Sequence, residues 1–428
     1  MSAEPIRMRT PAEESLPALF DAALDHLPGS DAAKAERRAA IALVRDKGLP
    51  HRRVEAFHYT DLRALIREVP GLAAAADNAV GAPLVEGSVL AGFTNGRLTR
   101  VPEAREGLTF VSFTEYAATR LDDAGAVSAS LDDTVVNLNT AFATDGARFT
   151  VGTGLAEGAV IELQSAMVGE GQVHLAHRIV VEAGASVTVV DRQSGPDAVP
   201  YLSTAVLDVE VGEGASLTLV RLQEEGDGAT RLDRLSVTLA EGATFALHQV
   251  AAGGALWRGE IRLAILGDDV TAHLKGASLL KGRQHGDVTL FVDHGALNGT
   301  STETFKVVAT DEARAVFQGK ILVRPGAQKT DGKMMSNGLL LSEKADFLTK
   351  PELEIFADDV ACGHGATCGD IDETHLFYLM ARGIPRLEAE QLLVAAFVEE
   401  VIDEVANEAL KEAMEARVDA WLKARSAA

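Results

Sequence analysis

The regular spacing of glycine-centred turns constrains the fold of this chain more than any other feature. In the middle of the chain, short runs of Val, Ile, Leu and Thr alternate with polar residues and break at turns of the form acidic-Gly-Ala or Gly-Asp-Asp. A period of this length is typical of a solenoid, in which each unit buries its apolar face only by stacking on the next. The turn glycines recur every 25 to 30 residues, at Gly158, Gly184, Gly214, Gly242, Gly267 and Gly295.

A common plan of strand, turn and strand fills each period. It is visible in residues 178–190, 208–220, 236–248 and 262–274. A tight corner requires a positive φ, which glycine adopts without strain, so we predict a left-handed glycine at each corner. A β-sandwich also contains many short strands, but its loops usually vary more in length. The spacing therefore favours a β-helix, with a sandwich as the alternative.

The N-terminal part of the chain has a helical pattern. Within residues 11–75, Ala, Leu, Glu and Arg dominate and apolar residues recur at three- and four-residue intervals. Gly48, followed by Pro50, is a helix stop signal. Residues 76–130 are mixed in pattern, with a strand candidate at 108–113.

The helical pattern returns near Asp370. Asp370 and Glu373 predict an acidic capping box, Gly383 predicts a helix end, and Pro385 opens a long amphipathic segment. We expect part of its apolar stripe to cover strand edges at the end of the solenoid. That stripe includes Leu392, Ala395, Phe397, Val401 and Ile402.

These patterns divide the chain into three regions. We predict an N-terminal helical and mixed region (1–130), a β-helix core (131–369) and a C-terminal helical domain (370–428). The fold class is therefore mainly β, with helical regions on both sides of the core.

Composition and charge narrow the classes of function. The 428 residues carry a net charge of −23, which argues against binding to nucleic acid or to an anionic membrane surface. Residues 1–20 lack the apolar core of an export signal, and no apolar stretch is long enough to span a bilayer. The two cysteines cannot form a disulfide framework. We therefore expect a soluble protein of the cytoplasm.

No sequence motif of an enzyme stands out, and we expect no catalytic residues. Asp358 with Asp359, and Asp370 with Asp372, could form the carboxylate pair of a glycosidase. Sugar-binding sites usually contain aromatic side chains, which make up only 5% of this chain, and the export signal expected of a secreted glycosidase is missing. A carbohydrate-active β-helix enzyme that uses acidic turn residues is therefore the alternative function.

Three soft donor residues lie close together near the end of the predicted core. Cys362, His364 and Cys368 provide thiolate and imidazole, which iron–sulfur clusters, zinc and copper favour. A closed structural zinc site needs four ligands, so three are too few. These residues could hold a transient ion whose coordination a second chain completes, or they could be inert residues buried near the last coil. The residues alone leave both readings open.

A series of motifs surrounds these donors: Gln328–Lys333, Ser336–Leu341, Lys350–Ile355, Ala357–Thr367, Asp370–Glu373, Leu376–Leu379 and Arg382–Ile384. Together they resemble the SufB/SufD family, and within it the SufD branch. Upstream, Arg53–Glu55 and His58–Leu62 resemble the N-terminal element of the same family.

The resemblance implies a right-handed parallel β-helix in a non-catalytic scaffold subunit of the SUF iron–sulfur cluster assembly complex. It implies pairing with SufB through the β-helix, docking of the ATPase SufC on helices in 371–428, and a role in iron acquisition. In isolation, a homodimer is the alternative assembly. No tightly bound cofactor is expected, but transient iron or a cluster shared with SufB is, and the family complex can carry reduced flavin.

The same resemblance marks Cys362 and His364 as the metal candidates. Two departures from the family pattern stand out. Phe57 replaces a usual Trp, and Cys368 occupies a position that is often apolar, so Cys368 is only a further candidate ligand.

Overall fold

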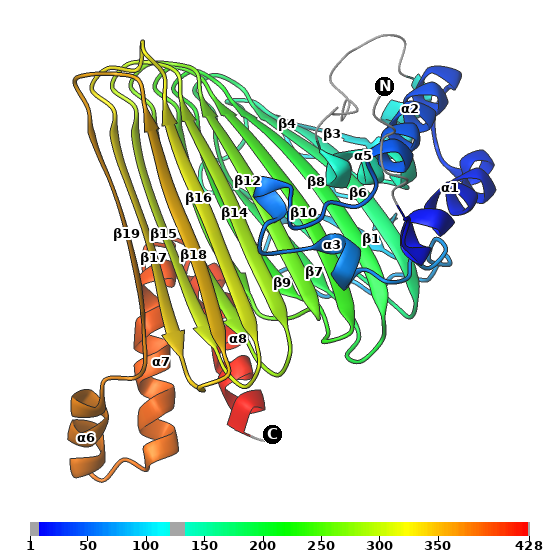
Figure 1. Ribbon diagram of the computed structural model, residues 1–428. Coiled ribbons are helices and arrows are strands. Elements are labelled where there is room, and N and C mark those ends of the chain that lie inside the picture. The colour runs from blue at the N-terminus through cyan, green and yellow to red at the C-terminus, as the bar shows by residue number, and fades with distance from the viewer. Residues whose placement is uncertain (1–7, 120–132, 427–428) are drawn as a thin grey trace, which may run out of the picture.

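Parallel pairing between alternate strands organises the molecule. The computed structural model describes residues 8–119 and 133–426. Each core strand pairs in parallel with the strand two positions further along the chain, so consecutive strands lie alternately in two facing sheets. The result is a parallel β-solenoid of about eight turns with helices at both ends, as Figure 1 shows. The predicted fold class is therefore confirmed. The two sheets face each other as in a sandwich, but their parallel pairing excludes that alternative.

The nine-stranded sheet is called sheet A here. In spatial order it contains β18 (Asp346–Ile355), β16 (Arg314–Val323), β14 (His285–His294), β12 (Leu256–Ile265), β10 (Ala229–Leu239), β8 (Tyr201–Val211), β6 (Gly171–Val181), β4 (Ala147–Val151) and β3 (Leu108–Ser112). The antiparallel partner β3 of β4 ends the sheet.

The ten-stranded sheet is called sheet B. In spatial order it contains β19 (Ala361–Gly369), β17 (Asp331–Leu340), β15 (Thr300–Ala309), β13 (Thr271–Leu280), β11 (Thr244–Ala251), β9 (Ser216–Glu224), β7 (Ser186–Ser194), β5 (Val160–Ala166), β1 (Val89–Thr94) and β2 (Arg97–Arg100). Here too an antiparallel pair, β1 with β2, ends the stack.

The core lies between the sheets and is built from columns of like residues. Because strand side chains alternate in direction, every second residue points inward. Leu235 and Val237 of β10, for example, pair with Ile261 and Leu263 of β12, and none of the four is more than 1% exposed. This stacking buries the apolar alternation that the sequence shows.

The predicted corner glycines are only partly confirmed. Gly158, Gly184, Gly214 and Gly242 have positive φ values of 60° to 75°. The prediction is wrong for Gly267 and Gly295, because the left-handed corner residues of those coils are Asp269 and Asn298. Asp and Asn tolerate this conformation better than other residues with a side chain. Gly267 is instead required by close packing, since a Cβ there would overlap the backbone of Glu241.

The N-terminal region contains shorter helices than its pattern predicts. Gly48 ends a helix as expected, but within residues 49–75 the structure has only two short helical segments. The strand candidate at 108–113 corresponds to β3. The helical elements are α1 (Pro11–Ala23), η1 (Leu24–His26), α2 (Asp31–Lys47), η2 (Glu55–Phe57), α3 (Leu62–Leu65) and α4 (Phe113–Thr119).

One helix lies in the segment for which strands were expected. Helix α5 (Thr134–Phe142) begins after the N-cap Asp133, and all nine of its residues are buried between α2 and strands β6, β8 and β10. Its short apolar run is the kind whose periodicity does not separate helix from strand. The predicted boundary between residues 130 and 131 lies outside the described residues.

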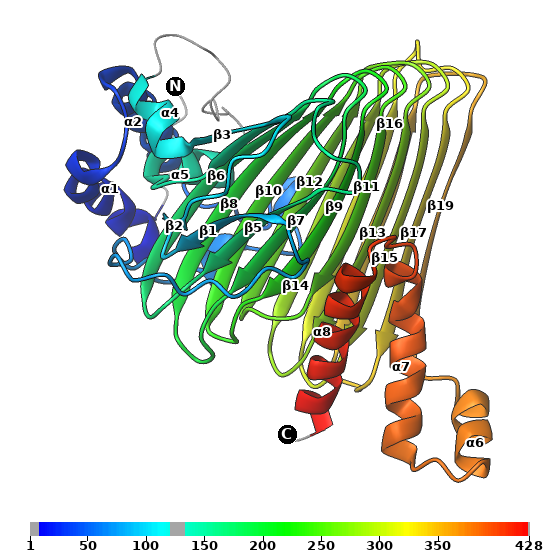
Figure 2. The same ribbon diagram turned by 180° about the vertical axis from the view of Figure 1, so that it is seen from behind.

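The C-terminal helices are α6 (Glu373–Ala381), α7 (Arg386–Ile402) and α8 (Glu408–Ser426). Of these, α7 and α8 pack on the outer face of sheet B, as Figure 2 shows. The expectation that their stripe covers the end of the solenoid is wrong, because α7 contacts β11, β13 and β15. The outer face of sheet B is apolar here, with Val220, Leu222 and Val250 packed against these helices. Leu392, expected in the stripe, is 48% exposed.

The start of α6 also differs from the prediction. Asp372 rather than Asp370 is the N-cap, and its carboxylate accepts a hydrogen bond from the Thr374 backbone N–H at 2.7 Å. Gly383, with a φ of 89°, follows the end of this helix as predicted. Among the described helices, none has the length and apolar character needed to cross a membrane.

Candidate functional site

The three soft donors lie on one face of β19. Strand side chains alternate, so Cys362, His364 and Cys368 point to the same side. The parallel register pairs His364 with Met334 of β17, which is 2% exposed and belongs to the core between the sheets. Cys362 packs partly against that core. The donors therefore face inward, at the last rung of the solenoid.

That last rung is uncovered. No described strand pairs with the outer edges of β18 and β19, which together form what we call the open end. Cys362 is half-buried, whereas His364 and Cys368 are exposed. The reading of all three donors as buried, inert residues therefore does not fit the structure.

Spacing along the strand separates the donors into a pair and an outlier. Residues two apart on a strand are about 7 Å apart, which brings Cys362 and His364 side by side, while Cys368 lies about 13 Å beyond His364. Within residues 8–119 and 133–426, no group of three or more His, Cys, Asp and Glu side chains could hold a metal ion. Among the described residues these donors therefore do not form a complete metal site.

The environment of the thiols disfavours the thiolate. Burial raises the pKa of Cys362, and the carboxylates of Asp331 and Glu303 add to this, while a backbone hydrogen bond from Gly332 opposes it. Burial also raises the pKa of Cys368, together with Asp370 and Asp346. A thiol of this kind is a ligand only once a metal displaces its proton.

Sequence reasoning missed two inward-facing residues below His364. Met334 lies one rung below it, and Glu303 of β15 lies one rung below Met334. Burial raises the pKa of Glu303 to about 8, and Ser301 only partly offsets this. Glu303, Phe305 and Val307 are every second residue of β15, so they share one face of the strand. The two apolar residues could have indicated that this face, and Glu303 with it, is directed to the core.

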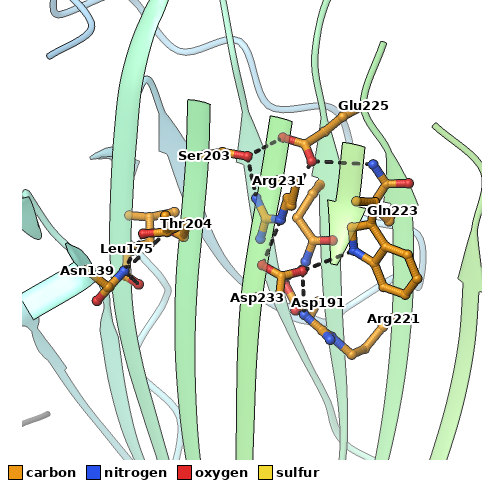
Figure 3. A network of polar contacts seen from close by, with 12 residues as sticks. Asn139, Leu175, Asp191, Ser203, Thr204, Arg221, Gln223, Glu225, Arg231 and Asp233 are labelled. Atoms are coloured by element: carbon orange, nitrogen blue, oxygen red, sulfur yellow. Dashed lines mark hydrogen bonds and ion pairs between the residues drawn. The ribbon is translucent and has the colours of Figure 1, made fainter. Parts of the chain in front are cut away.

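A second polar group lies inside the solenoid, far from the open end in sequence (Figure 3). Arg221 of β9 pairs with Asp191 of β7 at 3.0 Å and with Asp233 of β10 at 3.2 Å. Arg231 pairs with Asp233 at 2.8 Å and also with Glu225. The network joins the two sheets, and its paired charges point to a structural role.

Two of the four acidic residues considered for glycosidase chemistry have structural partners. Asp359 forms an ion pair with Lys329 at 2.7 Å, and Asp372 caps α6. These contacts are typical of surface turns and helix starts. They add no support for a carbohydrate-active site.

Four histidines of the core strands each have a hydrogen-bond partner of their own, although His248 and His273, on adjacent strands, are close enough to interact electrostatically. Their partners are Ser301 for His294, Thr60 for His285, the carbonyl of Val401 for His248 and Thr302 for His273.

The N-terminal segment that contains Glu55–Phe57 lies across the outer face of sheet A and contacts β12 and β18. The guanidinium of Arg258 lies 4.1 Å from the centre of the Phe57 ring and donates a hydrogen bond to the carbonyl of Ala56. Glu55 pairs with Lys350 of β18 at 3.0 Å. Phe57, the residue that departs from the family pattern, thus packs beneath a buried cation.

Several large apolar side chains of α6 and α7 are exposed. Phe377 is 73% exposed and Tyr378 56%, although the Arg382 guanidinium lies 4.8 Å from the centre of the Tyr378 ring. Exposed apolar residues that gather on a surface mark interaction sites. The set, called the α6 patch below, consists of Phe377, Tyr378, Met380, Leu387 and Leu392.

Comparison with known proteins adds an independent finding. Residues 161–397 match the family described as SUF system FeS cluster assembly, SufBD core domain. The iron–sulfur cluster assembly protein SufD of Escherichia coli is 33% identical over 228 residues, which is 53% of this chain and 54% of the relative. SufD of Bacillus subtilis is 30% identical over 247 residues, 52% of each chain.

A longer match involves a SufBD family protein of Synechocystis. It is 29% identical over 395 residues and covers 86% of both chains. The matches to the two SufD proteins span about half of the length of those relatives.

Proposed function

Because the chain belongs to the SufBD family of iron–sulfur cluster assembly proteins, we propose that it is a non-catalytic scaffold subunit of the SUF complex. In this role its open end pairs with SufB, and its C-terminal helices dock the ATPase SufC. The complex works in the reducing cytoplasm, in keeping with cysteines that form no disulfide in the described chain.

The observation that carries the proposal is the uncovered last rung with its inward-facing donors. Edge strands with free N–H and C=O groups are templates for pairing with another chain. A second solenoid that stacks on β18 and β19 would cover Cys362 and His364 and bring its own side chains to them. In the isolated chain, a second copy takes that place.

Iron, as the cargo of the complex, is the ion that this end would receive. Cys362 and His364 supply a thiolate and an imidazole, and the partner supplies the remaining ligands. Cys368 lies further along the same face and contributes only if the partner brings the cluster to it. Reduced flavin belongs to the assembled complex, and no residue of this chain is assigned to it.

The test is His364→Ala in the complex co-expressed with SufB and SufC. Even residues that merely orient a metal ligand are worth about 10- to 100-fold in metal affinity. We therefore expect a severalfold or greater loss of iron and acid-labile sulfide per purified complex, with subunit stoichiometry unchanged because His364 is exposed.

His26→Ala serves as the control, since His26 is exposed in η1, far along the chain from both the open end and the helices proposed to dock SufC. Undiminished iron and sulfide in the His364→Ala complex would reject the proposed role in iron acquisition.

A further inference from the structure

The rung below the soft donors contains another soft donor. The inward-facing residues of β17 below Cys362, His364 and Cys368 are Gly332, Met334 and Gly338, in that order. Two of these three lack a side chain, so of the three only Met334 places a side chain directly below a donor.

The packing of Met334 shows that its sulfur lies between the two sheets. Met334 is 2% exposed, and a Cβ on Gly319 of β16, in the opposite sheet, would overlap its Sδ atom. The next residue, Met335, points to the outer face of sheet B and is 41% exposed. Two adjacent methionines thus have opposite environments.

The side chain of Cys362 also approaches β17, the strand below it. Its Sγ lies 3.5 Å from the position that a Cβ on Gly332 would occupy, and the Gly332 backbone forms a hydrogen bond with the thiol. Neighbouring rungs are about 4.8 Å apart. Metal bonds to sulfur and to imidazole nitrogen are about 2.0–2.3 Å long, so one ion between the rungs can reach donors on both.

We propose that Met334 is a third ligand, which donates its thioether to the ion held by Cys362 and His364. This inference rests on the proposed function and makes it more specific. Binding would displace the thiol proton of Cys362 to solvent at the open end, and any further ligand would come from a partner. A donor set of thiolate, imidazole and thioether selects soft ions such as Cu(I) or sulfur-bound iron over Mg²⁺ and Ca²⁺.

The test measures Cu(I) binding by the full-length isolated chain in competition with a coloured Cu(I) chelator. We expect Met334→Leu to weaken Cu(I) binding about tenfold or more, by analogy with the cost of disturbing metal ligation. Leu has nearly the same volume, so the core should keep its packing. The matched control is Met335→Leu, which should leave the affinity unchanged.

X-ray absorption of the Cu(I)-loaded proteins gives a second readout that a packing effect would not produce. The wild type should show two sulfur neighbours at copper, and Met334→Leu should show one. Equal affinity and two sulfur neighbours in Met334→Leu would overturn the inference.

The readouts keep failure of the inference separate from failure of the proposed function. If Cys362→Ser and His364→Ala abolish Cu(I) binding while Met334→Leu does not, only the third ligand is wrong. If His364→Ala leaves iron and sulfide of the complex undiminished, the proposed function fails on its own experiment.

Discussion

At the residue scale, two carboxyl groups buried in the core have pKa values shifted in opposite directions. Burial opposes ionisation of Asp191, but Arg221 and Arg231 outweigh it and lower its pKa. Glu303 has no basic partner among the interactions that shift it, and burial raises its pKa to about 8. Neither of its carboxylate oxygens has a hydrogen bond of normal geometry. Inside the solenoid, Asp191 is therefore held as a paired charge, and Glu303 is held as a neutral acid near neutral pH.

Replacing Glu303 should change how stability depends on pH. Its pKa rises from 4.5 to about 8 on folding, so between these values the folded state holds a proton that the unfolded state has lost. The free energy of unfolding of the wild type should therefore fall with rising pH, by at most about 1.4 kcal/mol per unit. In Glu303→Gln no carboxyl group titrates at this position, so the free energy of unfolding does not fall with pH for this reason. The free energy of unfolding of the variant minus that of the wild type should therefore increase from pH 5.5 to 8.5.

Denaturant unfolding at several pH values measures this difference. Glu352→Gln, on the outer face of β18, is the control and should follow the wild type. Parallel stability curves for Glu303→Gln and the wild type would contradict the argument.

At the element scale, α7 is held to the solenoid and α6 is not comparably held. Lys306, Lys275 and His248 of sheet B contact backbone carbonyls of α7 at Phe397, Glu400 and Val401 respectively. Basic side chains at the C-terminal end of a helix also complement its dipole. Helix α6 extends from α7 away from the solenoid (Figure 1). The residues of the α6 patch are exposed.

If the α6 patch docks the ATPase, Phe377→Asp should disrupt that contact. Interface residues of this kind contribute about 2 kcal/mol or more, so binding should weaken about 30-fold or more. Copurification with SufC measures the effect, and Val101→Asp, an exposed substitution in the N-terminal region, is the control. Undiminished copurification would refute the docking role of α6. Deleting residues 371–428 is a poorer test, because it would expose Val220, Leu222 and Val250 of sheet B.

At the scale of the whole molecule, the two ends of the solenoid differ. At the N-terminal end, the antiparallel strands β2 and β3 end the sheets. At the open end, no described strand pairs with the outer edges of β18 and β19. Proteins usually protect such edges against unwanted pairing. This difference between the ends suits a protein that stacks a partner solenoid on one end only.

Hydrogen exchange can test this assignment. Backbone amides of β18 and β19 should exchange more slowly when SufB is added to the chain, because pairing would hydrogen-bond groups now open to solvent. Amides of β2, at the opposite end, should not change and provide the internal control. Protection in β2 with none in β18 and β19 would show that pairing uses another surface.

The sequence by itself favoured a solenoid core over a sandwich and identified its helical ends and the three donor residues. Each follows from a local pattern: a turn period of 25 to 30 residues, a helical repeat, and a short run containing Cys362, His364 and Cys368. Only the tertiary structure decided that Met334 lies below His364, that Glu303 is buried, and that α7 covers a sheet face rather than the open end. The strand–turn–strand pattern repeats in every coil, so it can be recognised from neighbouring residues alone. The register of strands some 30 residues apart, and the choice of an apolar face for helix docking, depend on contacts that form only when the coils stack.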